Sequence, residues 1–399
     1  MSRAASVNRR AISLPMRSCG TRSYWPGARP SSASSSAISP EISGDCIGAG
    51  YTTFCTLDQL LYGGPMHWRI AARPRGRELR IDDFTAHQDE PREPLQPGEV
   101  RLRTLLLSCD PAQKGWMENA GGYAAPTNVG DIMPATGIGQ VIESGVAGLV
   151  PGDFVAGPLG WRHEAVVAAA LLDKLPPDRE RLPMHLGALG GSGLTAWFGM
   201  ATAAHPDPGD TLVVTGAGGA VGSVAGQIGR IAGCRVIGIA GGPAKCRWLT
   251  EELGFAAAID YKSQDLKAMI AEHAPGGIDI LWDNVGGDQL DTLLGRLALG
   301  ARVVLCGGIA RYEQPGRPAG PSNYFNLVFR RATMTGILLT DHKADFPRAR
   351  QRLAGFVDSG QIRTREDIAE GLEQAPEILM RLFRGENIGK LLIRVADPE

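Results

Sequence analysis

Five compact apolar runs follow residue 190, and segments with a helical pattern separate them. The runs, which predict strands, are Thr211–Thr215, Arg235–Ala240, Ala257–Tyr261, Ile278–Asn284 and Arg302–Cys306. The helical segments are one that ends at Gly229, followed by Ala244–Leu253, Asp265–His273 and Gln289–Leu297. Near-continuous apolar strands are typical of sheets that are buried on both faces. This alternation therefore predicts βαβ units in a doubly wound parallel sheet.

Residues from Met66 to about 185 have a different pattern, in which short β-rich runs are separated by Pro and Gly turns. The runs are His67–Ala71, Val100–Ser108, Gly137–Glu143, Asp153–Ala156 and Trp161–Val167. Near the end of the chain, a helix is predicted over Pro376–Arg384, a turn over Gly385–Gly389 and a strand over Lys390–Val395. The fold class is therefore α/β, with a mainly β domain beside the doubly wound one.

The first 65 residues lack both periodicities. Residues 1–40 contain six arginines, no acidic residue and the serine-rich run Ser31–Ser36. Three interpretations stay open: the true start is Met66, which we prefer, the segment is a disordered native extension, or it is an organelle transit peptide. We expect residues 1–65 to add nothing to the fold.

Composition narrows the function classes. The formal net charge is −1, and no block of like charge suggests a nucleic-acid partner. No run reaches the roughly 20 apolar residues that a membrane span requires. The seven cysteines are scattered without a CxxC pair, as in a reduced protein of the cytoplasm. We therefore expect a soluble cytoplasmic protein that binds neither nucleic acid nor membrane.

A glycine-rich loop joins the first apolar strand after residue 190 to its helix. The loop residues are Gly216, Ala217, Gly218, Gly219, Ala220, Val221 and Gly222. Glycines spaced three apart at a strand-to-helix junction allow a tight turn, contact of the backbone with pyrophosphate and close helix packing. Free amides at the helix start attract phosphate. The loop predicts a dinucleotide site.

The end of the second strand predicts which dinucleotide is bound. NAD-specific sites place a carboxylate there to bind the ribose 2′-hydroxyl. The segment Ala240–Arg247 has no carboxylate and carries two cations. Lys245 is the first candidate ligand of a 2′-phosphate and Arg247 the second. NADP(H) is the expected cofactor.

Several further motifs carry a family resemblance. They are Leu189–Trp197 (LGGSGLTAW), Ile259–Lys262 (IDYK), Asp283–Gly287 (DNVGG) and Gly385–Lys390 (GENIGK). With the glycine loop, they resemble the zinc-independent branch of the medium-chain dehydrogenase/reductase superfamily. This branch holds leukotriene B4 dehydrogenases, prostaglandin and curcumin reductases and alkenal double-bond reductases. The likeness runs from Met66 to about Val395.

The resemblance implies a GroES-like catalytic domain over 66–186, a Rossmann domain over 187–358, and a return of the chain to the catalytic domain over 359–399. We also expect a homodimer. Besides the glycine loop, the implied NADP contacts are Lys245, Tyr261, Asn284, Cys306, Gly307, Gly308, Ile309, Tyr312, Ile337, Leu338, Leu339 and Asn387. One departure is Asp110–Lys114 (DPAQK), which replaces the usual Asp-Pro-Tyr-Met-Arg and removes a substrate-side tyrosine and arginine.

The sequence offers no metal site and no nucleophile set. Zinc dehydrogenases need a Cys/His/Cys-type set, and His163-Glu164 lacks the surrounding zinc pattern. Without a metal, reduction of a conjugated C=C bond is easier than reduction of C=O, because a hydrogen-bond donor can stabilise the enolate oxygen. Candidate donors are Tyr312 first, Tyr123 second and Tyr324 third, and the ribose hydroxyl of the cofactor could share the task.

The expected activity is therefore NADPH-dependent reduction of an enone or enal. Two alternatives stay open, a quinone reductase of the same superfamily and a catalytically silent NADP-binding protein.

Overall fold

The computed structural model describes residues 64–119, 125–314, 316 and 319–399. The interpretation of residues 1–63 and the candidate Tyr123 lie outside the described residues. All described residues belong to one compact unit of the chain.

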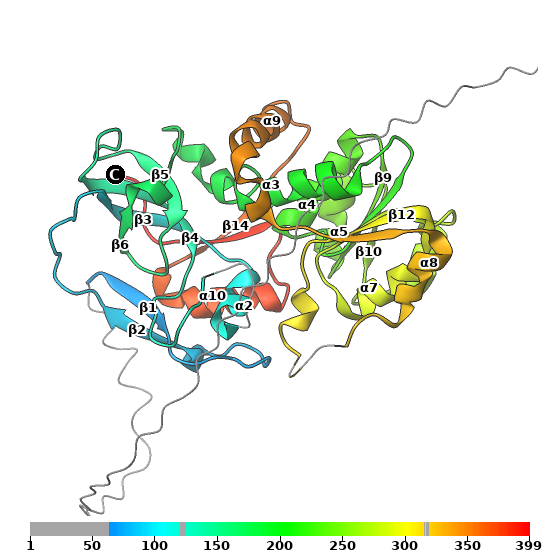
Figure 1. Cartoon of the computed structure of the whole chain (residues 1–399), viewed down its shortest axis with the longest axis horizontal. Helices are drawn as coiled ribbons and strands as arrows, with labels where there is room; N and C mark the ends of the chain where they lie inside the picture. Colours follow the sequence, from blue (N-terminus) through cyan, green and yellow to red (C-terminus); the bar gives the residue numbers. More distant parts are fainter. Residues whose placement is uncertain (1–63, 120–124, 315, 317–318) are drawn as a thin grey trace, which may run out of the picture. The chain divides into compact units, whose positions relative to one another are not determined.

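A six-stranded parallel sheet forms the second half of the fold, with the strand order β10-β9-β8-β11-β12-β13 (Figure 1). Its strands are β8 (Thr211–Val214), β9 (Arg235–Ala240), β10 (Ala257–Asp260), β11 (Ile278–Asp283), β12 (Leu297–Leu305) and β13 (Thr333–Gly336). The order reverses at β8, from which the chain runs first toward β10 and then, from β11, toward β13. Ligands bind at such a switch point, beyond the carboxyl ends of the strands.

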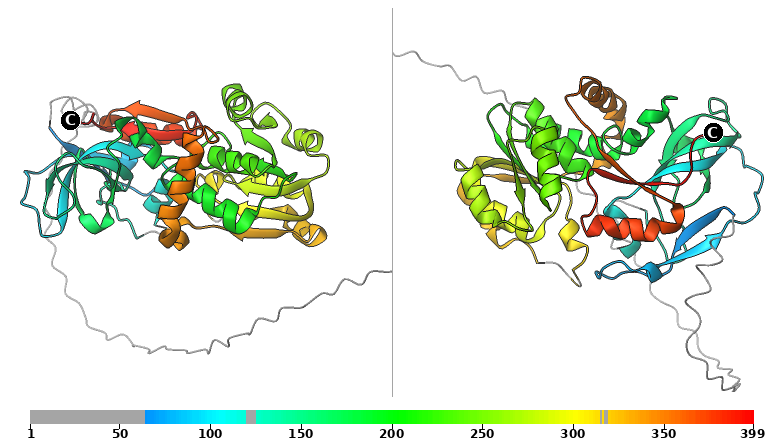
Figure 2. Two further views of the ribbon diagram at one scale, coloured as in Figure 1. Left: turned by 90° about the horizontal axis from the view of Figure 1, so that it is seen from above. Right: turned by 180° about the vertical axis from the view of Figure 1, so that it is seen from behind.

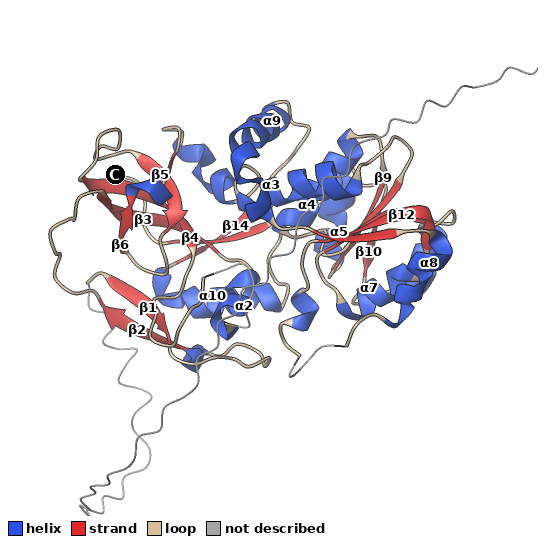
Figure 3. Cartoon of the chain, viewed as in Figure 1, coloured by secondary structure: helices blue, strands red, loops and turns tan. Residues whose placement is uncertain are grey.

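Helices lie on both sides of this sheet (Figure 3). They are α3 (Gly191–Gly199), α4 (Ala220–Ile231), α5 (Pro243–Arg247), α6 (Leu266–His273), α7 (Gly287–Leu294), α8 (Asn326–Arg330) and α9 (Phe346–Asp358). Alternate residues of β8 face opposite sides: Leu212 and Val214 pack with residues of α3, α4 and α9, and Val213 packs with residues of α6 and α7. Two separate cores therefore hold the sheet rigid.

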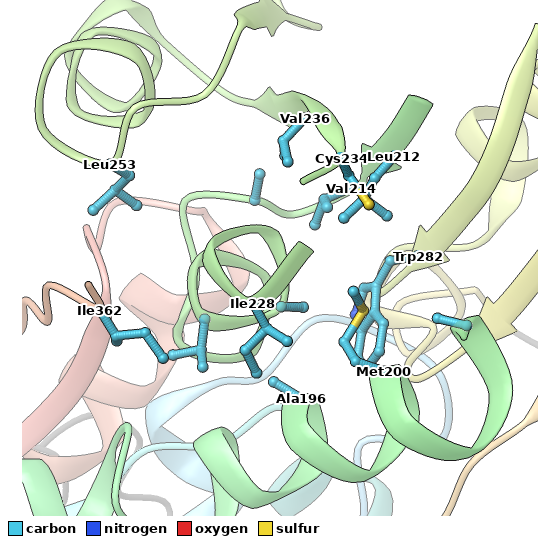
Figure 4. Close-up of a cluster of buried hydrophobic side chains, with 14 of the residues drawn as sticks. Ala196, Met200, Leu212, Val214, Ile228, Cys234, Val236, Leu253, Trp282 and Ile362 are labelled. Carbon is cyan, nitrogen blue, oxygen red and sulfur yellow. The ribbon is translucent and has the colours of Figure 1, made fainter. Parts of the chain in front are cut away.

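The first of these cores shows how closely the helices approach the sheet. Ala196, Met200 and Ile228 face Leu212 and Trp282 (Figure 4). All five side chains are buried. Their packing keeps α4, which follows the glycine loop, in a fixed position over β8.

The other half of the fold is mainly β. A seven-stranded sheet contains β3 (Glu99–Ser108), β4 (Thr136–Ser144), β5 (Phe154–Pro158), β6 (Glu164–Ala168), β7 (Asp173–Lys174), β14 (Glu366–Glu370) and β15 (Lys390–Arg394). A hairpin of β1 (Met66–Ile70) and β2 (Phe84–Gln88), and the helices α2 (Ala112–Glu118) and α10 (Ala375–Phe383), accompany it. β15 pairs antiparallel with β3, so the end of the chain returns to the early strands (Figure 2).

The predicted fold class is confirmed. The strand Arg235–Ala240 was predicted at its observed bounds, and most other predicted elements differ by one to three residues. Two differences are larger: β12 starts at Leu297, where the pattern predicted the end of a helix, and the helix predicted over 244–253 changes from α5 to a π-helical segment at Trp248–Glu252. β13 and β14 were not predicted, because their residues lack a buried run.

Candidate functional site

A cavity of about 230 Å³ opens at the carboxyl ends of β8, β9, β10 and β11. Most of its lining comes from the β3–α2 loop, the ends of the parallel strands with the residues that follow them, and the segment from α10 into β15, and α3 and α7 add one residue each. The lining residues are Cys109, Asp110, Pro111, Ser192, Gly216, Gly218–Gly222, Ala240, Gly241, Lys245, Tyr261, Asn284, Val285, Gln289, Ile309, Leu382, Phe383, Gly385, Asn387 and Gly389–Leu391.

The glycine loop forms one wall of this cavity. Gly216 has φ +57°, a conformation that few residues other than glycine adopt. A Cβ on Gly222 would lie 2.5 Å from the Gly216 carbonyl oxygen, so only glycine allows α4 to approach the turn. The N-cap residue Gly219 provides no side-chain acceptor, and the first N–H groups of a helix have no partner within it. The amides at the start of α4 therefore remain available to an anion.

The C-terminal turn fastens this loop from the other side. The Gly389 amide donates to the Gly218 carbonyl oxygen at 2.8 Å. Lys245 Nζ donates to the Gly385 carbonyl oxygen at 2.8 Å, and Asn387 Nδ2 donates to the Gly389 carbonyl oxygen at 2.9 Å. Asn387, a predicted cofactor ligand, thus lines the cavity but uses its amide to shape the turn.

Positive charge dominates the end of β9. Burial lowers the pKa of Lys245, and the nearby Lys262 ammonium lowers it further. The Asp367 carboxylate acts in the opposite direction on Lys245, but its ion pair is with Arg381. Asp260 does not line the cavity, and its Oδ1 accepts from the Gly242 amide at 2.8 Å, a bond that lowers the pKa of this carboxyl. A half-buried ammonium in the cavity wall suits the 2′-phosphate of a dinucleotide.

The ends of β10 and β11 carry Tyr261 and Asn284. Tyr261 is 43% exposed and lines the cavity. Asn284 Nδ2 donates to the Thr215 carbonyl oxygen at 2.7 Å, and the Thr215 hydroxyl donates to Asp283 Oδ1 at 2.7 Å. Burial raises the pKa of Asp283. This network ties the end of β11 to the end of β8 and fixes the shape of the glycine loop.

The loop after β12 is divided between two cavities. Ile309 lines the first, whereas Cys306, Gly307, Gly308 and Tyr312 line a neighbouring cavity of about 690 Å³. Burial raises the pKa of the Cys306 thiol to about 12, so this cysteine is a packing residue at neutral pH.

Tyr312 lies beside α2. A Cβ built on Gly115 would be 3.6 Å from the Tyr312 ring. The fully buried Lys114 donates from Nζ to the Tyr312 carbonyl oxygen, and burial lowers the pKa of this lysine. Lys114, which stands where the family motif has arginine, therefore holds the loop that carries Tyr312, the predicted hydrogen-bond donor.

The remaining predicted residues, among them the fully buried Ala217 of the glycine loop, line neither cavity. Ile337 and Leu339 pack against the core beneath α3, and neither they nor Leu338 line the cavities described above. Arg247 is exposed on α5 and lines neither cavity. Tyr324 is 58% exposed and packs edge-on against Phe325.

Sequence reasoning missed an ion pair in the cavity wall. Lys390 Nζ lies 2.6 Å from Asp110 Oδ1 and donates to the Cys109 carbonyl oxygen at 3.1 Å. The Lys390 side chain is 3% exposed and that of Asp110 34%. The partners are 280 positions apart, and only the pairing of β15 with β3 brings them together. In the sequence, only the motifs DPAQK and GENIGK, which contain Asp110 and Lys390, could have drawn attention to this ion pair.

Ser192 and Gln289 were also missed. Ser192 lies in the first turn of α3 and is 7% exposed, and Gln289 lies in the first turn of α7. Both line the cavity. Their positions follow from helix packing, which the sequence pattern does not specify.

Two further observations concern metal and membrane. Within the ranges that the structure describes, no three His, Cys, Asp or Glu side chains are placed to hold a metal ion. His163 Nδ1 instead accepts from the Met66 amide at 2.9 Å. Over the same ranges, no helix has the length and apolar character needed to cross a bilayer.

Two family models match the chain: "N-terminal domain of oxidoreductase" over residues 66–175 and "Zinc-binding dehydrogenase" over residues 220–355. The NADPH-dependent curcumin reductase of Escherichia coli is 35% identical over 337 residues, which cover 83% of this chain and 97% of that protein. The NADP⁺-dependent 2-alkenal reductase of Nicotiana tabacum is 33% identical over 330 residues, 82% of this chain and 95% of that protein.

A solved structure leads to the same family as these sequence relatives. The crystal structure of CurA from Vibrio vulnificus in complex with NADPH matches with a TM-score of 0.78 and 34% identity, over 84% of this chain and all of that one. The chain thus belongs to the zinc-independent branch of the medium-chain dehydrogenase/reductase superfamily, among the curcumin, alkenal and prostaglandin reductases.

Proposed function

We propose that the protein reduces the carbon–carbon double bond of α,β-unsaturated ketones or aldehydes with NADPH, by hydride transfer to the β-carbon. The observation that carries the proposal is the single cavity that joins a dinucleotide loop to the β3–α2 loop. The curcumin reductase and the 2-alkenal reductase described above, which support the proposed substrate class, are 35% and 33% identical to this chain.

NADPH is the cofactor. The amides at the start of α4 would bind its pyrophosphate, and Lys245 would bind its 2′-phosphate. When bound, NADPH supplies the hydride. The Gly389–Gly218 bond holds the loop in the shape that leaves those amides open.

The other end of the cavity is suited to an apolar substrate with one carbonyl group. Pro111, Leu382, Phe383 and Leu391 line it. The Asp110–Lys390 pair neutralises its own charge and fixes the β3–α2 loop against β15. We assign to this pair a positioning role, because Lys390 is buried behind the carboxylate.

Hydride addition to the β-carbon places negative charge on the carbonyl oxygen, and a hydrogen-bond donor must stabilise that charge. Tyr312 remains our first candidate. It lines the neighbouring cavity, and Lys114 holds its backbone through the carbonyl oxygen. Ser192, whose side chain lines the cavity itself, is a second candidate that the structure adds. Solvent would protonate the α-carbon.

Substrate turnover tests the proposed activity. NADPH oxidation should be rapid with enones and enals and at least ten-fold slower, in kcat/KM, with quinones or saturated ketones. A preference for quinones would favour the alternative quinone reductase. No turnover with any of these substrates, despite NADPH binding, would favour the catalytically silent alternative.

Lys245→Ala should weaken NADPH binding by about 1.5–3 kcal/mol, or roughly 10–150-fold, because a charge-assisted hydrogen bond to the phosphate is lost. NADH binding should change little. Arg247→Ala is the matched control, since Arg247 is an exposed cation on the same helix that does not line the cavity. Titration of both cofactors by fluorescence measures the effect. Equal losses for NADPH and NADH would show that Lys245 acts only through its bond to Gly385.

Tyr312→Phe should lower kcat by about 10–100-fold, somewhat less than the loss typical of an oxyanion donor, because the ribose hydroxyl shares the task. The Kd of NADPH should stay unchanged. Ser192→Ala, measured in parallel, separates the two candidates. Unchanged kcat for Tyr312→Phe with a large loss for Ser192→Ala would transfer the role to Ser192, and unchanged kcat for both would contradict a protein hydroxyl as donor at either position.

A further inference from the structure

Gln289 has an unexplained acceptor. Its Oε1 atom is buried, lacks a hydrogen-bond partner among the described residues, and belongs to a side chain that lines the cavity. Buried polar atoms without a partner are rare in native proteins, because each loses its hydration without replacement. An acceptor of this kind in a cavity wall is open to a ligand group that donates a hydrogen bond.

The position of Gln289 restricts which part of the ligand this is. α7 follows the end of β11 and packs against α6, which follows Tyr261 at the end of β10. Gln289, in the first turn of α7, therefore lies on the face of the sheet that α6 also covers. Asp110 and Lys390, on the β3–α2 loop and β15, belong to the other half of the fold.

The end of β9 and the residues that follow it mark the adenosine half of a bound dinucleotide. In doubly wound sites, the group that binds the adenosine ribose lies at the end of the second strand, here β9, where Lys245 follows. Gly241, Tyr261 and Val285 line the cavity together with Gln289. These residues are available to contact the adenine base attached to that ribose.

We propose that Gln289 recognises the adenine base through its exocyclic N6 amine. A glutamine carboxamide presents one acceptor and one donor, which match the N6 amine and N7 of adenine. Hypoxanthine carries a carbonyl oxygen in place of the amine, so it would set an acceptor against the buried Oε1. Gln289 is thus a specificity-determining residue for the base. The inference rests on the cofactor half of the proposed function and does not depend on the substrate.

Direct binding of two cofactors tests the inference. The probes are NADPH and its deamino analogue, reduced nicotinamide hypoxanthine dinucleotide phosphate, titrated against the full chain by calorimetry without substrate. The wild-type protein should bind NADPH about 3–10-fold more tightly than the analogue, the scale of one hydrogen bond. Gln289→Leu should lose more affinity for NADPH than for the analogue, because both bases keep N7 but only adenine carries the N6 amine, and the ratio should fall near one.

Two variants serve as controls. Gln289→Glu retains an acceptor and should keep the preference for NADPH over the analogue. Asp288→Asn, at an exposed neighbour that lines the other cavity, should change neither affinity.

Two results would overturn the inference: a wild-type protein that does not discriminate between the cofactors, or a Gln289→Leu variant that loses affinity for both equally. The ratio of the wild-type affinities for NADPH and the analogue tests the inference even if the Gln289→Leu variant fails to fold. Failure to reduce enones would refute the proposed reaction without affecting this result.

Discussion

The site depends on one backbone constraint: the glycine loop must expose the amides of α4 on one side while it is held from the other. The Gly389 amide meets the Gly218 carbonyl oxygen, and Lys245 reaches the Gly385 carbonyl oxygen. Both bonds join the Rossmann sheet to the last segment of the chain. Because β15 also pairs with β3, a shift of the C-terminal turn would move the glycine loop and the β3–α2 loop together.

The side of the cavity at the β3–α2 loop is built in the same way, from contacts between segments distant in sequence. Lys390 pairs with Asp110, and Lys114 contacts the carbonyl oxygen of Tyr312. Both lysines are buried, so neither contact is expected to exchange freely with water. These contacts hold the β3–α2 loop against β15 and against the loop that follows β12. The cavity is therefore largely formed before a ligand binds.

Local pattern was enough to predict the sheet, the glycine loop and Lys245, and the family resemblance added Tyr261 and Asn284. All three residues line one cavity, because each follows the end of a buried strand. It could not show that Asn284 and Asn387 use their amides to hold the backbone. Nor could it find Ser192, Gln289 or the Asp110–Lys390 pair. Their positions arise from helix packing and from the late pairing of β15 with β3, which depend on contacts between distant residues.

The central claim is that hydride goes to the β-carbon of a conjugated carbonyl compound. The measurement is the position of deuterium in the product formed from an enone and NADPH carrying deuteride at the transferring position. The account predicts the label on the β-carbon of a saturated ketone. Label on the carbonyl carbon of an alcohol would show that the C=O bond is reduced, and would contradict it.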